Sequence, residues 1–136
     1  MSPAEWFVDA GYWIAWLNSS DAWHARARGI ASGLRRRLVT TEAVLLEVGN
    51  AFARPPWRPR ATPFLAAIRA NPNISIVPVD ADLARRALQL YSARPDKEWG
   101  LTDCVSFVVM QERGITEALA ADHHFEQAGF RALLPG

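Results

Sequence analysis

Short apolar runs alternate with helical segments along the whole chain, and this alternation constrains the fold more than any other feature. We expect strands at residues 6–9, 37–40, 74–79, 117–121 and 130–133. We expect helices at about 10–17, 22–33, 42–52, 62–70, 81–91, 102–113 and 123–128. Strands separated by helices form mainly parallel sheets with helices on both faces. The sequence therefore predicts an α/β fold.

Capping and helix-breaking residues set the expected boundaries. Thr41 before Glu42 is typical of a helix start, and Gly114 is a plausible helix stop. The segment 54–60 holds three prolines, which remove backbone donors and favour extended geometry, so we expect a stiff loop there. Pro63, in the favoured first position, then begins the next helix, while Thr102 caps a later one.

The chain has 136 residues, which predicts one domain over residues 1–136. Half of the residues are apolar and about a fifth are charged, as in an ordinary globular protein. No apolar run approaches the roughly 20 residues of a membrane span, and the amino terminus lacks a secretory signature. The only cysteine, Cys104, fits a reducing compartment. We therefore expect a cytoplasmic protein without membrane association.

Four acidic residues stand at the edges of expected elements: Asp9, Glu47, Asp103 and Asp122. Asp9 and Asp122 follow apolar strands, and the carboxyl ends of parallel strands are where α/β sheets bind ligands. Four converging carboxylates repel one another unless a cation neutralises them. Oxygen ligands select hard ions such as Mg²⁺ or Mn²⁺, which assist phosphodiester hydrolysis. The pattern indicates a metal-dependent nuclease.

Structural roles compete with this interpretation. Asp9 and Asp122 could cap the helices that follow them, and Asp103 could be a first-turn acid favoured by the helix dipole. Glu47 is harder to explain structurally, because an unpaired charge near an apolar helix face is costly. His123 and His124 could suggest zinc, but no other Cys or His has ligand spacing, so a structural or rim role is favoured.

Arginine dominates the basic residues, of which only Lys97 is lysine. The guanidinium fork suits phosphate, although genomic base composition explains the same bias. The expected proline-rich loop gathers a tryptophan and several arginines, and a loop tryptophan could stack on a base or cover the neighbouring apolar helix. The possible RNA contacts are Arg54, Trp57, Arg58 and Arg60.

Four stretches of the sequence together resemble the PIN-domain ribonucleases, in particular the VapC toxins of bacterial toxin–antitoxin modules. They are residues 7–9, 40–48, 99–107 and 118–130, in this order and spacing. The resemblance covers the whole chain. It implies a three-layer sandwich around a central, mainly parallel sheet of about five strands, with Mg²⁺- or Mn²⁺-dependent cleavage of RNA.

The resemblance also assigns roles residue by residue. It makes Asp9, Glu47, Asp103 and Asp122 the metal ligands and catalytic residues, and it gives Thr102 a supporting hydrogen-bonding role. Some relatives carry another acid where this chain has His124, which places the second metal in doubt. Asp96 and Glu98 are weaker candidates at the rim.

The implied partners are an RNA substrate, a cognate antitoxin and a second copy of the chain in a homodimer. We expect the antitoxin to place a cation near the four acids and to pack on apolar residues between 41 and 70, namely Val44, Leu45, Phe52, Phe64, Leu65 and Ile68. Those residues could equally be core or dimer contacts. The rival functions are a solitary PIN-type nuclease acting on DNA or RNA and a non-catalytic PIN scaffold.

Overall fold

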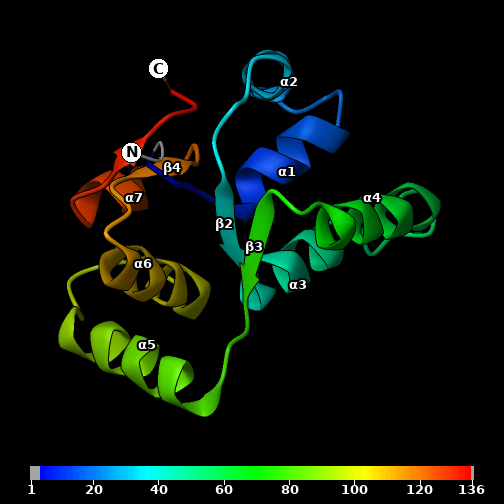
Figure 1. Cartoon of the computed structure of the whole chain (residues 1–136). Helices are drawn as coiled ribbons and strands as arrows, with labels where there is room; N and C mark the ends of the chain where they lie inside the picture. Colours follow the sequence, from blue (N-terminus) through cyan, green and yellow to red (C-terminus); the bar gives the residue numbers. More distant parts are fainter. Residues whose placement is uncertain (1–3, 136) are drawn as a thin grey trace.

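Five parallel strands form the centre of the molecule (Figure 1). The computed structural model describes residues 4–135. The strands lie in the order β3-β2-β1-β4-β5, and every neighbouring pair is parallel. Their bounds are β1 Trp6–Val8, β2 Leu38–Thr41, β3 Ile74–Val77, β4 Glu117–Leu119 and β5 Arg131–Ala132. The expected α/β class with a parallel five-stranded sheet is confirmed.

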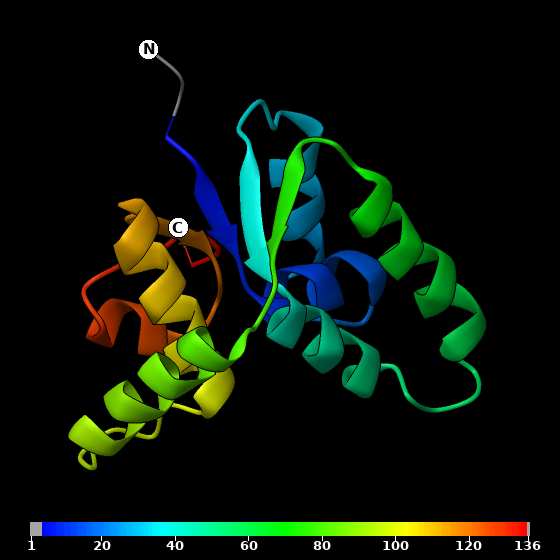
Figure 2. The same ribbon diagram turned by 60° about the horizontal axis from the view of Figure 1, so that its bottom comes forward.

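Seven helices in the described residues connect and cover the strands. On one side of the sheet lie α1 Ala10–Leu17, α2 His24–Ser32, α3 Glu42–Ala51 and α4 Arg58–Ala70. On the other side lie α5 Ala81–Ala93, α6 Leu101–Arg113 and α7 His123–Gln127. Figure 2 shows the same two groups of helices with the twisted sheet between them.

Buried apolar side chains from the central strands hold the layers together. Phe7, Val39 and Leu119 are fully buried, and Phe125 of α7 packs on Phe7 with its ring centroid 6.3 Å away. The hydroxyl of buried Thr40 donates to the carbonyl of Val8 at 3.0 Å, which ties β2 to the end of β1. This packing fixes the carboxyl ends of the central strands.

Several helix boundaries differ from those expected. Helix α4 begins at Arg58, so part of the segment expected to be a loop is helical. The first-turn N–H groups of a helix have no intrahelical partner, so Pro59 loses little there, and Pro63 lies inside the helix rather than at its start. Helix α6 begins at Leu101, so Thr102 lies inside its first turn and Gly100 is the N-cap.

Other boundary predictions are confirmed. The Thr41 side chain accepts a hydrogen bond from the N–H of Val44 at the start of α3. Gly114 ends α6 with φ of 66°, the left-handed conformation that favours glycine. Among residues 4–135, no helix is both long and apolar enough to cross a membrane.

Candidate active site

The ends of β1 and β4 bring two of the four acids to one edge of the sheet. Asp9 follows β1 directly, and Asp122 follows β4 after two residues and precedes α7. Val8 is paired with Leu119 across these parallel strands, and the N–H of Asp9 donates to the Leu119 carbonyl at 3.1 Å. The strand register therefore positions Asp9 beside the segment that carries Asp122.

Helices α3 and α6 supply the other two acids, and the four form what we call the acidic cluster: Asp9, Glu47, Asp103 and Asp122. Burial, together with the charges of Asp103, Glu47 and Asp122, raises the pKa of Asp9 to about 7. The pKa of Glu47 is raised as well, because its carboxylate, although the residue is exposed, is partly desolvated and lies near the charges of Asp103 and Asp122. The four carboxylates are thus close enough to repel one another.

The structural roles considered for these acids occur in part. Asp122 caps α7 by accepting the N–H of His124 at 2.9 Å, and Asp103 accepts the N–H of Gly100 at 3.1 Å. Asp9 occupies the N-cap position of α1, but its side chain makes no capping bond. The expectation that Glu47 lies near the apolar face of α3 is wrong, since Glu47 is exposed while Val48 is buried.

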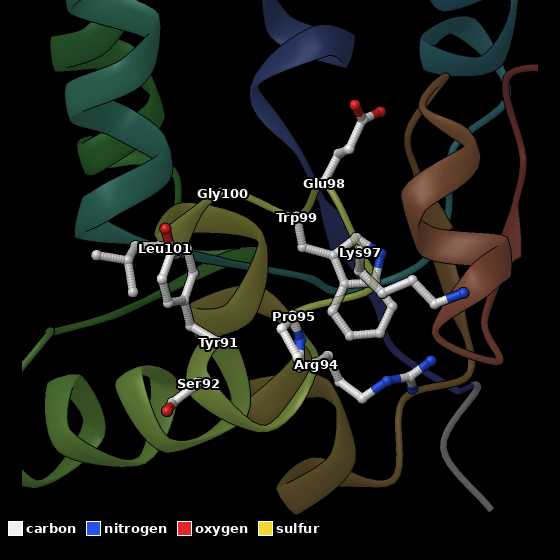
Figure 3. A pocket seen from close by; sticks show the side chains of 9 residues that line it. All are labelled: Tyr91, Ser92, Arg94, Pro95, Lys97, Glu98, Trp99, Gly100 and Leu101. Carbon is white, nitrogen blue, oxygen red and sulfur yellow. The ribbon is translucent and has the colours of Figure 1, made fainter.

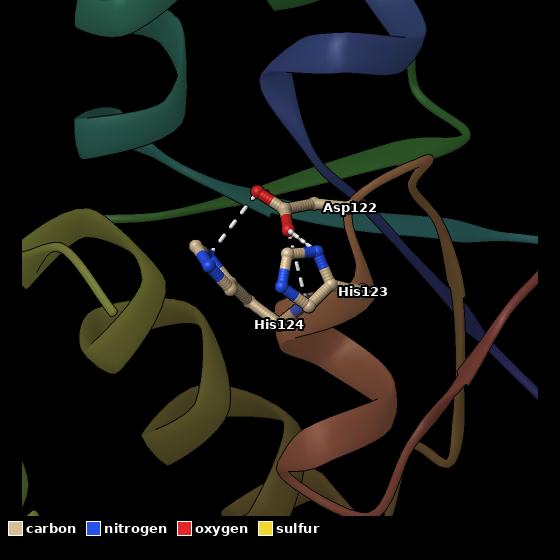
Figure 4. Close-up of side chains that lie close together, drawn as sticks. All are labelled: Asp122, His123 and His124. Atoms are coloured by element: carbon tan, nitrogen blue, oxygen red, sulfur yellow. Dashed lines mark hydrogen bonds and ion pairs between the residues drawn. The ribbon is translucent and has the colours of Figure 1, made fainter. Parts of the chain in front are cut away.

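His123 and His124, for which the sequence favours a structural or rim role, lie against Asp122 of the acidic cluster (Figure 4). His124 Nδ1 lies 3.2 Å from Oδ2 of Asp122, as Figure 4 shows. It also lies 3.2 Å from Oδ2 of Asp103. His123 Nδ1 lies 3.4 Å from Oδ1 of Asp122. The sequence feature that could have indicated this contact is the direct succession Asp-His-His. Asp122 caps the helix that begins with both histidines, so its carboxylate lies beside their imidazoles.

Spacing within the site separates two groups of possible ligands. In the part of the chain that the structure describes, one group of at least three Asp, Glu, His or Cys residues has ligand atoms that all lie within 4.8 Å of one another. The group consists of Asp122, His123 and His124. Among residues 4–135, no three of the four carboxylates meet this criterion. Water molecules retained in the shell of an ion such as Mg²⁺ would bridge the difference.

The sequence proposed three further residues at this site, Thr102 as a support and Asp96 and Glu98 at the rim, and the structure places each differently. The Thr102 carbonyl accepts from Ser106 Oγ at 3.0 Å, and over residues 4–135 the Thr102 hydroxyl has no hydrogen bond that would support the cluster. Asp96 is paired with Arg94 at 3.0 Å and with Lys97 at 3.8 Å. Glu98 is exposed near the two histidines, where it lines a polar cavity.

Comparison with known proteins decides the family. Residues 6–131 match the family model described as the PIN domain. The chain belongs to the PIN-domain family. Curated relatives include the 23S rRNA-specific endonuclease VapC20 of Mycobacterium tuberculosis, from strains CDC 1551/Oshkosh and ATCC 25618/H37Rv. Each is 33% identical over 129 residues, covering 95% of this chain and 98% of the relative.

A solved structure supports the same assignment. The crystal structure of Mycobacterium tuberculosis VapC20, described as a sarcin-ricin loop cleaving toxin, matches with a TM-score of 0.84 and 33% identity. The match covers 91% of this chain and 95% of the other. The resemblance inferred from the four sequence stretches is confirmed at the level of the PIN family.

A large cavity in this PIN domain lies beside the start of α6 (Figure 3). Its volume is about 650 Å³, and it is lined by Tyr91, Ser92, Arg94, Pro95, Lys97, Glu98, Trp99, Gly100 and Leu101. The Arg94 guanidinium lies 5.2 Å from the Trp99 ring centroid, and Tyr91 and Leu101 are about half exposed. The Glu98 carboxylate points away from Arg94 in this view. Cations and aromatic rings next to the helix that carries Asp103 suit a nucleic acid strand.

The residues expected to contact RNA before and within α4 have partners inside the protein. The Trp57 ring packs on Phe52 with centroids 4.9 Å apart, and the Arg60 guanidinium lies 5.1 Å from the Trp57 centroid. Arg60 also donates to the Leu17 carbonyl at 3.2 Å, and Arg58 donates to the carbonyl of Ala53. Trp57 therefore covers the apolar end of α3, which was the alternative considered for it. Arg54 is exposed.

The apolar residues expected to meet an antitoxin are mostly part of the core. Val44, Leu45, Phe52 and Ile68 are buried within the PIN domain, so the expectation that they form a free surface is wrong. They face inward because they lie on the sides of α3 and α4 that cover the sheet. Phe64 and Leu65 are partly buried against the same core. The large apolar residue that α3 exposes is Leu46, next to Glu47.

Proposed function

We propose that this PIN domain is a metal-dependent endoribonuclease toxin that hydrolyses RNA phosphodiester bonds and is inhibited by a cognate antitoxin. The observation that carries the proposal is the acidic cluster. Its four carboxylates have no Arg or Lys partner in residues 4–135, although arginine pairs with most other acids of the chain. Arginine neutralises many surface acids of this protein, but within the described residues no arginine neutralises the acidic cluster. The uncompensated negative charge suits a divalent cation.

The donor set fits a hard divalent ion. Asp9, Glu47, Asp103 and Asp122 would hold Mg²⁺ or Mn²⁺, since carboxylate oxygens and retained water fill the coordination shell of such ions. Burial first, and then the neighbouring carboxylates, raise the pKa of Asp9, and a bound cation would lower that pKa again. The ion would neutralise the charge developing on the scissile phosphate and activate the attacking water.

The protein's own side chains would position the substrate. Arg94 and Lys97 line the large cavity next to α6 and offer cationic contacts to the phosphates that flank the scissile bond. Tyr91, half exposed in the same cavity, offers a surface on which a base can stack. Asp103, held by the N–H of Gly100, is fixed where this cavity meets the acidic cluster.

The named target of the relatives supports a proposal for the substrate. Because the VapC20 proteins that match over almost the whole chain are 23S rRNA-specific endonucleases, a structured RNA is the proposed target, and the sarcin-ricin loop of 23S rRNA is the first to test. We propose that the protein acts on this RNA in the cytoplasm, pairs with an antitoxin, and forms a homodimer. Light scattering on the purified protein checks the dimer.

Cleavage of matched oligonucleotides tests the function. An RNA hairpin with the sarcin-ricin sequence, its DNA equivalent and a scrambled RNA are incubated with the purified protein in Mg²⁺, Mn²⁺ or EDTA. We expect cleavage of the RNA hairpin that EDTA abolishes and that Asp9→Asn and Asp103→Asn both prevent. Cleavage of DNA at an equal rate would favour the DNA-directed nuclease, while no cleavage of any substrate would favour the non-catalytic scaffold.

Co-expression tests the partner. The neighbouring small open reading frame is expressed with the protein, and growth and complex formation are followed. We expect growth inhibition by the protein alone, relief by the partner and a stable complex. If no complex forms and cleavage is unchanged, the protein is a solitary PIN-type nuclease rather than a toxin.

A further inference from the structure

At position 124 this chain has an imidazole where some relatives carry another acid. The three side chains of Asp122, His123 and His124 present ligand atoms that all lie within 4.8 Å of one another. Each oxygen of Asp122 faces a different ring nitrogen: Oδ1 lies 3.4 Å from His123 Nδ1 and Oδ2 lies 3.2 Å from His124 Nδ1 (Figure 4). The set combines one carboxylate with two imidazoles.

These separations match the edges of a metal coordination shell. Ligands bound at about 2.0–2.1 Å in a tetrahedral zinc site lie roughly 3.3–3.4 Å from one another. Both Asp122 to imidazole separations are close to this value, and all three ligand atoms lie within 4.8 Å of one another, so side-chain rotation alone would let them share one ion. The backbone that carries the three residues is fixed, because the Asp122 carboxylate caps α7 and Phe125 of that helix is fully buried.

The two histidines also border space that an ion can reach. His123 and His124 line a polar cavity of about 290 Å³ together with Asp96, Lys97, Glu98 and Gln127. Lys97, the one lysine of the chain, lies 3.8 Å from Asp96, so its charge is partly neutralised there. Exposed Glu98 adds a second carboxylate to the lining of the cavity. Water and polar groups are available to complete a coordination shell.

We propose that Asp122, His123 and His124 form a second cation site that binds a transition-metal dication, such as Zn²⁺, in preference to Mg²⁺. Imidazole nitrogen favours zinc and other transition metals, whereas Mg²⁺ demands oxygen ligands. Residue 124 then sets which ion this part of the site accepts. The inference rests on the proposed function, because that function makes Asp122 a metal ligand. The site itself depends on the two imidazoles and can be tested without RNA cleavage.

Histidine NMR tests the site without any RNA. The chain has three histidines, and His24 serves as an internal control because its Nδ1 lies 2.7 Å from the carbonyl of Ala15, outside the cluster. Imidazole nitrogen signals are followed at constant pH while Zn²⁺ or Mg²⁺ is added. We expect Zn²⁺ to shift the coordinating nitrogens of His123 and His124 at one equivalent, Mg²⁺ to cause no such shift, and His24 to remain unchanged.

The opposite results would overturn the proposal. If saturating Zn²⁺ leaves the nitrogens of His123 and His124 uncoordinated, the imidazoles serve only as hydrogen-bonding partners of Asp103 and Asp122. Equal zinc shifts at all three histidines would indicate nonspecific binding and would also reject the site. RNA cleavage in Mg²⁺ is scored separately, so loss of the zinc signal and loss of the ribonuclease are distinguishable.

Variants sharpen the test. His124→Asp replaces imidazole by carboxylate, so we expect Zn²⁺ affinity by calorimetry to fall at least about tenfold and Mg²⁺ to compete with the remaining Zn²⁺. His123→Ala should weaken Zn²⁺ in the same direction without allowing Mg²⁺ to compete. The matched control, His24→Gln, should bind Zn²⁺ as the wild type does. Unchanged Zn²⁺ affinity in both cluster variants, each with a wild-type circular dichroism spectrum, would contradict the assignment.

Discussion

Acidic residues of this PIN domain behave in opposite ways in its two charged regions. On the outer helices Asp82 is paired with Arg85 at 2.7 Å and with Arg86 at 3.0 Å, and hydrogen bonds from these arginines lower the pKa of Asp82. At the strand ends the pKa of Asp9 rises to about 7, because burial and neighbouring acids both disfavour its charge. The acids of the outer helices are neutralised by arginines of the same protein, whereas the acids at the strand ends have no arginine partner within residues 4–135.

The difference shows how a site can be recognised without a bound ligand. Arginine is plentiful in the sequence, so a guanidinium beside the acidic cluster was available and was not used. Unneutralised acids destabilise the fold, and residues that cost stability without structural gain mark functional sites. Asp103 and Asp122 contact imidazoles instead, which can also bind metal.

Removing one acid from each region should have unequal effects on activity. Asp103→Asn keeps the shape of the side chain and loses a charge needed for the cation, so we expect metal-dependent RNA cleavage to fall at least about 100-fold. The matched control Asp82→Asn removes a surface carboxylate with two arginine partners and should retain wild-type cleavage. Single-turnover assays with labelled RNA measure both. Comparable losses in the two variants would mean that the acidic cluster has no special role.

The pH dependence of stability should also separate the regions. The folded-state pKa of Asp9 lies above its unfolded value of 3.8, so the folded metal-free protein favours the proton and loses stability as pH rises from about 4 to about 7. The loss attributable to Asp9 is on the order of 4 kcal/mol. Asp82 and Asp96 have lowered pKa values, so their contributions are lost instead as pH falls below about 4. Urea unfolding in EDTA across this range measures both trends.

The variant Asp9→Asn provides the control for this pH dependence. It removes the titrating carboxylate, so the stability of the variant should change much less than that of the wild type between pH 4 and 7. A parallel decline in wild type and variant would assign the pH dependence to other groups.

Added metal should stabilise the protein most where the acids are charged. At pH 8 we expect Mg²⁺ or Mn²⁺ to raise the melting temperature, and at pH 5 we expect a smaller rise because protons compete for the carboxylates. Asp82→Asn should respond as the wild type does, and Asp103→Asn should respond weakly. Differential scanning fluorimetry with and without EDTA measures the shift. A rise that is the same at both pH values would indicate that the ion binds elsewhere.

Local chemistry in the sequence sufficed for much of this architecture. Thr41 and Asp80 cap helices in the structure as their residue types predict, and Asp9 follows a buried strand. Parallel strands align their carboxyl ends, so the proximity of Asp9 and Asp122 follows once β1 and β4 are neighbours. The acids could therefore be grouped from pattern and fold class together.

Features that depend on long-range packing could not be obtained in this way. Trp57 packs on Phe52, a contact that depends on the tertiary position of α4. The exposure of Glu47 depends on which side of α3 meets the sheet. The imidazoles of His123 and His124 reach Asp122 only because α7 begins at residue 123. The spacing of these residues in the sequence predicted roughly where they lie in the fold. It did not predict the direction of their side chains.

The smallest expected effect concerns a surface pair that should matter only at low salt. Arg69 donates two hydrogen bonds to Glu42, and these lower the pKa of the Glu42 carboxyl. Both side chains are more than a third exposed, so water and salt screen their attraction and little net stability remains. Glu42→Gln should therefore lower the free energy of unfolding slightly in 50 mM salt and not measurably in about 1 M salt. RNA cleavage should be unchanged, because the Glu42 carboxylate is paired with the Arg69 guanidinium and does not belong to the acidic cluster. A loss of cleavage in this variant would show that the surface pairs and the acidic cluster are not independent, and the contrast between the two regions would then have to be abandoned.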